Sequence, residues 1–318
     1  MTVGVLLAIL SLGVLIFFIH HVATSIQASR IIANVAADLE GAIDRQFPDT
    51  IGDGAPTAEG AAGAEEEAVA GDEGRPVITA TTGYVQAIDA ARLLTIAREH
   101  DVLVRVRARP GSFVRKGSVL LTVTPPPVPD VQEDDGPFRD AFIIGSNRTG
   151  TQDLTFFVDQ LVELAVRALS PGINDPGTAR LCVDRLEQAL CHLAARQIPS
   201  AARYDDSGRV RVFACPLTFA DIVESAFNEI ARYGRSSVSV TCRLLEAVRN
   251  VGTCVEREPD RRALLRQATV IASGIPRSEM SDSDRELIER CRRAALLALH
   301  VKPGDAPARG RRPLTGRR

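Results

Sequence analysis

The sequence predicts an α+β protein that begins with a transmembrane helix and continues into a small β-rich unit and a mainly α-helical domain. Three patterns carry this prediction. The first nineteen residues are almost entirely apolar, apolar residues alternate between 77 and 125, and apolar residues recur at three- and four-residue steps between 138 and 300. A length of 318 residues allows two folded units, and 45% apolar with 25% charged residues is ordinary for a globular chain.

The first element, residues 1–24, is predicted to be a transmembrane helix. No Asp, Glu, Lys or Arg occurs before Arg30, and the apolar run from Val3 to Ala23 reaches the roughly 20 residues that cross a bilayer. A cleaved signal peptide, which starts with positive charge and has a shorter apolar core, and a buried soluble helix are the alternatives. Positive charge follows the run and none precedes it. We therefore expect the inner (plasma) membrane, with the C-terminal domains cytoplasmic.

The next two segments connect this helix to the folded part. Residues 25–48 are predicted to form an amphipathic juxtamembrane helix, because Ile32, Val35, Leu39 and Ile43 recur on one face before Pro48 ends the run. That face is either a coiled-coil seam or a surface packed on another helix of the same chain. Residues 49–76 hold eight acidic residues against one arginine and few apolar ones, so they are predicted to be a disordered acidic linker.

Residues 77–125 are predicted to form a small β-rich unit. Residues 77–88 are expected to be one strand interrupted by Gly83, residues 89–99 a short helix, and the segments on either side of the turn Arg109–Ser112 two more strands. The pattern V-x-K-G-S-V-L-L, residues 114–121, resembles the second half of a biotinyl- or lipoyl-type barrel-sandwich unit. Because no lysine follows at a later hairpin tip, this resemblance implies the barrel-sandwich fold and no carrier function.

After a linker at 126–137, residues 138–300 are predicted to be a helical domain with one β-hairpin. The hairpin surrounds the turn Asp205–Gly208, and Thr218 is expected to cap the helix that follows it. Ser283 and Glu286 form a candidate capping box for the last helix. Residues 301–318 are predicted to be a basic, disordered tail.

Several functional classes receive no support from the sequence. A net charge of −2 and the absence of Trp argue against nucleic-acid binding. The six cysteines form no C-x-x-C pair and most lie beside apolar residues in helical runs, so we expect reduced, buried thiols. No phosphate-binding loop, dinucleotide fingerprint, zinc motif or serine-nucleophile motif occurs. We therefore expect no metal, no cofactor and no catalytic residue, and the sequence leans against an enzyme.

Two polar segments are the candidate ligand- or partner-binding sites. The first carries Arg148, Gln152 and Asp153 at the start of an apolar helix, where a capping role is the structural interpretation. The second is the loop Ser170–Gly177, which carries Asn174 and Asp175 between two apolar helices. A tight interhelical turn is its structural interpretation, and a rigid loop that presents both residues to a ligand is the functional one.

Five motifs carry a family resemblance. They are HHVATSIQAS (20–29), RPGSFVRKG (109–117), R-T-x-x-Q-D (148–153), ALSPGINDPGTA (168–179) and ARYGR (231–235). Together they resemble the bacterial predicted-membrane-protein family of unknown function DUF2254. Members of that family carry several transmembrane helices before the soluble region, and this chain is similar from the last of them onward. The resemblance implies an uncharacterised integral membrane protein, with the lipid bilayer as a partner and either a homo-oligomer or further upstream transmembrane segments.

Two functions remain open from the sequence. The first is a membrane-anchored cytoplasmic interaction or regulatory module, or part of a channel- or transporter-like assembly. The alternative is a membrane-bound enzyme with a polar pocket built from the Arg148–Asp153 and Ser170–Gly177 segments. Only the alternative requires those two segments to meet in space.

Overall fold

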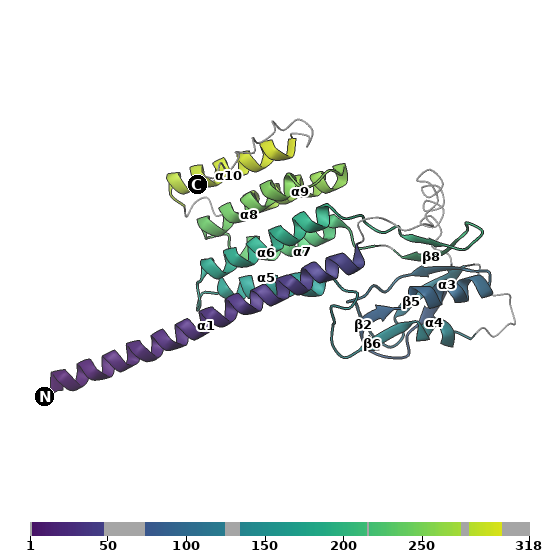
Figure 1. Ribbon diagram of the computed structural model, residues 1–318, viewed down its shortest axis with the longest axis horizontal. Helices are drawn as coiled ribbons and strands as arrows, with labels where there is room; N and C mark the ends of the chain where they lie inside the picture. Colours follow the sequence, from purple (N-terminus) through teal and green to yellow (C-terminus); the bar gives the residue numbers. More distant parts are fainter. Residues whose placement is uncertain (1, 48–73, 125–133, 215, 275–279, 301–318) are drawn as a thin grey trace, which may run out of the picture.

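The computed structural model describes residues 2–47, 74–124, 134–214, 216–274 and 280–300, without the side chains of residues 19–27 (Figure 1). Pro48, the predicted basic tail and most of both predicted linkers lie outside these described residues. The last two residues of the predicted acidic linker, Arg75 and Pro76, already belong to a strand.

The mixed α+β class is confirmed. The helices of the described residues are α1 (Thr2–Gln46), α3 (Ala90–Glu99), α4 (Gly136–Asp140), α5 (Thr155–Ala168), α6 (Pro176–Ala194), α7 (Phe219–Tyr233), α8 (Val238–Gly252), α9 (Glu258–Ser273) and α10 (Asp282–His300). The strands are β1 (Arg75–Ile78), β2 (Gly83–Ile88), β3 (Leu103–Val106), β4 (Phe113–Val114), β5 (Val119–Thr124), β6 (Phe142–Gly145), β7 (Ala202–Tyr204) and β8 (Val210–Ala214). The long helices stack beside one another, and the strands gather at the end of this stack that is remote from the N-terminus (Figure 1).

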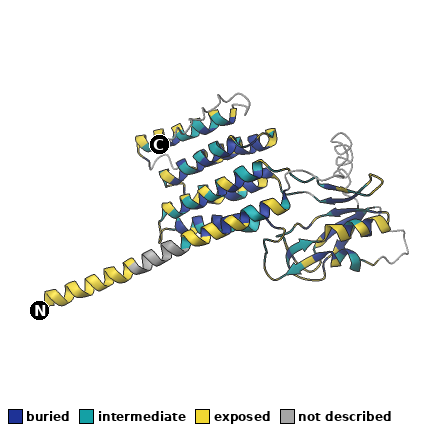
Figure 2. Cartoon of the chain, viewed as in Figure 1, coloured by how far each residue is buried: buried dark blue, intermediate teal, exposed yellow. Residues whose placement is uncertain are grey.

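Helix α1 has two halves with opposite surroundings. The stripe that includes Ile32, Leu39 and Ile43 is buried against α5 and α6. This contact decides between the two alternatives for the stripe, because its partners are helices of the same chain. Residues 2–18, by contrast, are exposed along their whole length (Figure 2). Within the described residues, we find no helix with the length and hydropathy of a membrane-crossing segment, so the predicted transmembrane helix stays a prediction.

The helical part forms around a continuous apolar core with well-defined helix starts. Helix α7 begins with a capping box, in which Thr218 accepts from the Asp221 backbone and Asp221 accepts from the Thr218 backbone. At α10 the predicted capping box of Ser283 is wrong. The hydroxyl of Ser281 accepts the Asp284 N–H instead, so the helix begins at Asp282.

The β-rich unit is not a closed barrel, which corrects the barrel-sandwich expectation. Among the described residues, the strands form a five-stranded sheet, β1-β5-β3-β8-β7, and a three-stranded sheet, β4-β2-β6. The expected single strand at 77–88 breaks into β1 and β2 at a turn in which the Thr79 hydroxyl accepts the Thr81 N–H. Because β1 and β2 then join different sheets, the chain cannot continue one ladder around a barrel.

The hairpin of the helical region completes the larger sheet. Strand β8 pairs in parallel with β3, matching Val104 to Val212, and β7 forms the sheet edge. Val212 is buried in the core of the β unit. The buried guanidinium of Arg211 donates to both Asp101, beside β3, and Asp205, in the hairpin turn. The β unit therefore includes strands from the segment assigned by sequence to the helical domain.

Of the free thiols in the described residues, those of Cys182 and Cys242 are buried and the other three are partly buried. The Cys254 thiol lies 2.7 Å from that of Cys191 on α6. Burial raises the pKa of Cys182 to about 12, and burial together with the neighbouring Cys291 thiol raises the pKa of Cys242 to about 12. Both thiols therefore stay protonated at neutral pH.

We expect the native Cys182 thiol to react with N-ethylmaleimide at least about ten times more slowly than in guanidinium, because only the thiolate is nucleophilic. Since its pKa is raised to about 12, the native rate should still be rising between pH 9 and pH 10, whereas an ordinary thiol reaches its plateau there. Peptide mass spectrometry after timed labelling measures both effects. Equal rates in the native and denatured chain would contradict the assignment.

Candidate functional site

The polar centre of the molecule lies where α5 begins. The Arg148 guanidinium donates to Asp153 from Nε at 2.9 Å and from a terminal nitrogen at 2.7 Å, and to Asp159 at 2.7 Å. Burial opposes the charged form of Arg148, but the hydrogen bonds to Asp159 and Asp153 outweigh it and raise its pKa. The Ser225 hydroxyl of α7 donates to the other Asp159 oxygen at 3.0 Å. Arg148 thus holds two carboxylates together and connects the loop before α5 to α7.

The second carboxylate oxygen of Asp153 supports the start of α5. It accepts the Thr155 hydroxyl at 2.6 Å and the Phe156 N–H at 3.3 Å. The Asp153 side chain is only 3% exposed, so its charge depends on these donors and on Arg148. This confirms that Asp153 accepts from the first turn of α5, the structural interpretation of the R-T-x-x-Q-D segment.

Gly111 allows the β unit to approach this carboxylate. The turn Arg109–Ser112 is fastened to β2, because Gly111 N–H donates to the Val85 carbonyl at 2.7 Å and Val85 N–H donates to the Ser112 carbonyl at 2.9 Å. Gly111 has φ +86°, and a Cβ atom at this position would lie 2.3 Å from Asp153 Oδ2. A glycine here therefore satisfies both the turn and the close contact. Two of the resembling motifs, RPGSFVRKG and R-T-x-x-Q-D, meet at this point.

Gln152 fastens the same loop to β2. Its amide accepts the Ile88 N–H at 2.9 Å and donates to the Ile88 carbonyl at 3.1 Å. Gln86 of β2 donates back to the Asn147 carbonyl at 2.8 Å. The loop 146–153 is thereby held to the β unit at several points. The described residues contain no group of His, Cys, Asp or Glu placed to hold a metal ion.

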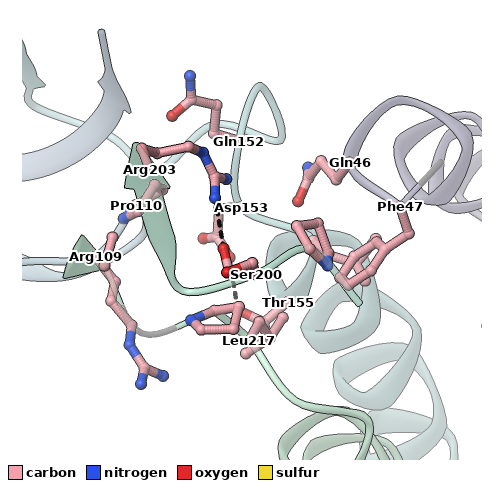
Figure 3. Close-up of a pocket in the computed structure, with 14 residues that line it drawn as sticks. Gln46, Phe47, Arg109, Pro110, Gln152, Asp153, Thr155, Ser200, Arg203 and Leu217 are labelled. Atoms are coloured by element: carbon pink, nitrogen blue, oxygen red, sulfur yellow. Dashed lines mark hydrogen bonds between the residues drawn. The ribbon is translucent and has the colours of Figure 1, made fainter. Parts of the chain in front are cut away.

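A cleft of about 240 Å³ opens beside Asp153, between the C-terminal end of α1 and the β unit (Figure 3). Gln46 and Phe47 lie on one side, Arg109 and Pro110 on the other, and Arg203, Ser200 and Asp153 between them. Its remaining lining residues are Gln152, Leu154, Thr155, Pro199, Ala214, Pro216 and Leu217. The cleft therefore combines arginine and amide groups with apolar walls.

The polar groups of this cleft differ in how well they are paired. The exposed Arg109 forms no ion pair within the described residues, and Arg203 donates from one terminal nitrogen to the Ser200 and Ala202 carbonyls. The Gln46 amide nitrogen is buried and finds no acceptor among the described residues. Such an unmet donor is costly in a folded protein.

The second predicted segment lies elsewhere. Asp175 caps α6, accepting the Thr178 N–H at 3.1 Å and the Thr178 hydroxyl at 2.6 Å, and Asn174 has φ +47° in the turn before it. This loop follows the C-terminal end of α5, whereas Asp153 precedes its N-terminal end. The 14 residues of α5 separate them by about 20 Å at 1.5 Å per residue. The structure does not bring Asn174 and Asp175 to Arg148, Gln152 and Asp153, so the single pocket required by the enzyme alternative is absent from the described residues.

Sequence reasoning identified part of this cleft and missed the rest. Gln152 and Asp153 line it, and Arg148 fixes Asp153 from behind. Gln46, Arg109 and Arg203 were not candidates, because each lies more than 40 residues from the other two and none belongs to a spacing pattern. The resembling motif around Gly111 is the one sequence signal that could have directed attention to Arg109.

One family model matches most of the chain. The family described as "Predicted membrane protein (DUF2254)" matches residues 1–250. The chain belongs to this family. Two uncharacterized proteins, one from Mycobacterium bovis and one from Mycobacterium tuberculosis, are each 29% identical to this chain over 288 residues. The match covers 89% of this chain and 53% of each relative, so the chain spans about half their length. No solved structure matches the chain.

Replacing Gly111 with Ala should destabilise this DUF2254 protein strongly. The change adds the cost of a left-handed alanine, about 1–2 kcal/mol, to a collision with the Asp153 carboxylate. The matched control is Gly117, which lies in the next turn, between β4 and β5. Its φ is +89°, and a Cβ there meets nothing within 4 Å. Denaturant unfolding of both variants should give the larger loss for Gly111→Ala. Equal losses would show that the contact with Asp153 contributes nothing.

Replacing Asp175 tests its capping role. Asp175→Ala should lower the free energy of unfolding by about 0.5–2 kcal/mol, whereas Asp175→Asn should stay close to the wild type, because Asn caps nearly as well. The same denaturant measurement applies. A loss in Asp175→Asn as large as in Asp175→Ala would show that the charge matters beyond capping.

Proposed function

We propose that this chain is a membrane-anchored interaction or regulatory module whose folded domains lie in the cytoplasm, held at the bilayer by the N-terminal half of α1. The observation that carries the proposal is the division of α1 described above. Its exposed half presents Val5, Leu10, Ile16 and other large apolar side chains, each more than half exposed. Soluble proteins rarely leave so continuous an apolar surface in water.

The charge pattern supports both insertion and direction. Residues 2–18 carry no charged side chain and measure about 25 Å at 1.5 Å per residue, which is most of the hydrocarbon depth. Positive charge begins at Arg30, on the side of the folded domains, as cytoplasmic flanks require. The membership in DUF2254 supports a membrane location in its own right.

The buried half of α1 supports an interaction or regulatory role. Because Leu39 and Ile43 are part of the helical core, the anchor is continuous with the folded domain and is not a flexible tether. The partners we propose for the exposed half are the bilayer and, within it, either a second copy of this chain or other transmembrane segments. A part in a channel- or transporter-like assembly would use the same contacts.

The full chain should sediment with membranes and resist carbonate extraction. Leu10→Arg combined with Val14→Arg should move the chain to the soluble or aggregated fraction, because an arginine at the centre of a span costs about 2.5–3.5 kcal/mol. Asn34→Arg is the matched control, since this exposed residue lies on the polar side of the buried half. Immunoblotting of the fractions measures the result. Release of the wild-type chain by carbonate would rule out the anchor.

A further inference from the structure

We propose that the cleft beside Asp153 binds a small organic anion, a phosphate or carboxylate group attached to a short apolar body. The three groups that would recognise it come from separate parts of the chain. Gln46 ends α1, Arg109 belongs to the turn Arg109–Ser112 between β3 and β4, and Arg203 lies on β7. The assignment of an anion to this cleft does not depend on how the chain associates with a membrane, whereas the argument below for a dissolved source rests on the membrane anchor proposed above.

The charges of the cleft favour an anion. Asp153 is the carboxylate that lines it, and its charge is neutralised by Arg148 from behind. Arg109 and Arg203 form no ion pair within the described residues, so the lining as a whole is positive. Because Arg203 uses one terminal nitrogen for the Ser200 and Ala202 carbonyls, its other nitrogens remain for an oxygen ligand. Guanidinium groups bind phosphate and carboxylate oxygens with paired hydrogen bonds.

The unmet donor of Gln46 points to the same ligand. Its amide nitrogen is buried at the C-terminal end of α1 and has no acceptor within the described part of the chain. Figure 3 shows this side chain reaching toward the space between Gln152 and Phe47. Because the nitrogen is closed to solvent in this arrangement, the Gln46 amide turns into the cleft when a ligand oxygen accepts this hydrogen bond. Arg203 and Gln46 face the same part of the cleft in Figure 3, whereas the guanidinium of the exposed Arg109 points away from them and meets the same anion by turning its side chain.

The apolar walls require more than a bare ion. Phe47, Pro110, Leu154, Pro199 and Leu217 line the same cleft, and its volume of about 240 Å³ exceeds what an inorganic ion needs. Small-molecule sites commonly combine apolar walls with a few placed polar groups. The ligand body is thus short and apolar.

The distance along α1 between the cleft and the proposed membrane span indicates that the anion is a dissolved molecule and not a lipid headgroup. Gln46 lies 28 residues beyond Phe18, which is about 42 Å at 1.5 Å per residue. With residues 2–18 in the bilayer, the lipid headgroups lie near Phe18, far from Gln46 and the cleft. A dissolved anion reaches the cleft directly.

The test uses the full chain in detergent micelles and isothermal titration calorimetry with phenyl phosphate and with benzoate. The wild type should bind at least one of them, and benzylamine, a cation of similar shape, should not bind. Arg109→Gln and Gln46→Met should each weaken binding about tenfold, the loss of one hydrogen bond to a charged group. The control is Arg115→Gln, which should leave the affinity unchanged. Arg115 is exposed, lies between β4 and β5, and does not line the cleft.

Thermal unfolding of each variant separates binding from folding. If Gln46→Met unfolds, the affinity of Arg109→Gln alone decides the test, because Arg109 is exposed. The proposal is wrong if the wild type binds neither anion, if benzylamine binds equally well, or if Arg109→Gln binds like Arg115→Gln. Repeating the titration in phosphatidylcholine vesicles with and without phosphatidic acid tests the source. Competition by phosphatidic acid would overturn the assignment to a dissolved anion.

Discussion

The salt bridge between Arg148 and Asp153 is the interaction on which the arrangement of the two folded parts depends. Asp153 starts α5, touches the Gly111 turn of the β unit and lines the cleft. Arg148 neutralises it and reaches Asp159, which in turn accepts from Ser225 on α7. A carboxylate as buried as Asp153 needs such a partner, because removing one member of a buried pair leaves an uncompensated charge. One arginine therefore fixes the position of the β unit relative to the helices.

Local patterns predicted most of the helical part, although the start of α10 was placed at the wrong serine. Thr218, Asp175 and the apolar faces of α5 and α6 follow rules that operate within a few residues, and the structure confirms them. Strand partners were harder, because β3 pairs with β8 more than one hundred residues away and nothing within either strand identifies the other. The expected barrel failed at another point, where the turn after β1 sends β1 and β2 into different sheets.

The candidate site likewise contains residues that a local pattern identifies and residues that only long-range packing brings together. Arg148, Gln152 and Asp153 lie in one short polar segment, so composition alone identified them. Gln46, Arg109 and Arg203 line one cleft only because α1 packs on α5 and α6, and because the turn Arg109–Ser112 approaches Asp153. Asn174 and Asp175 share the composition of a binding loop, yet their hydrogen bonds serve the turn and the start of α6. Composition does not distinguish a turn from a binding loop when both need Asn, Asp, Gly and Pro.

The parallel pairing of β3 with β8 determines when the larger sheet can form during synthesis of the chain. The central strand of the larger sheet cannot find its neighbour until residue 214 has left the ribosome, by which time α5 and α6 are already available. Until then, the edge of β3 exposes unpaired backbone groups that can join a strand of another chain. Helices α5 and α6 must emerge before the β unit that precedes them in the chain can close, so a ribosome stalled between residues 125 and 202 would hold an open sheet edge.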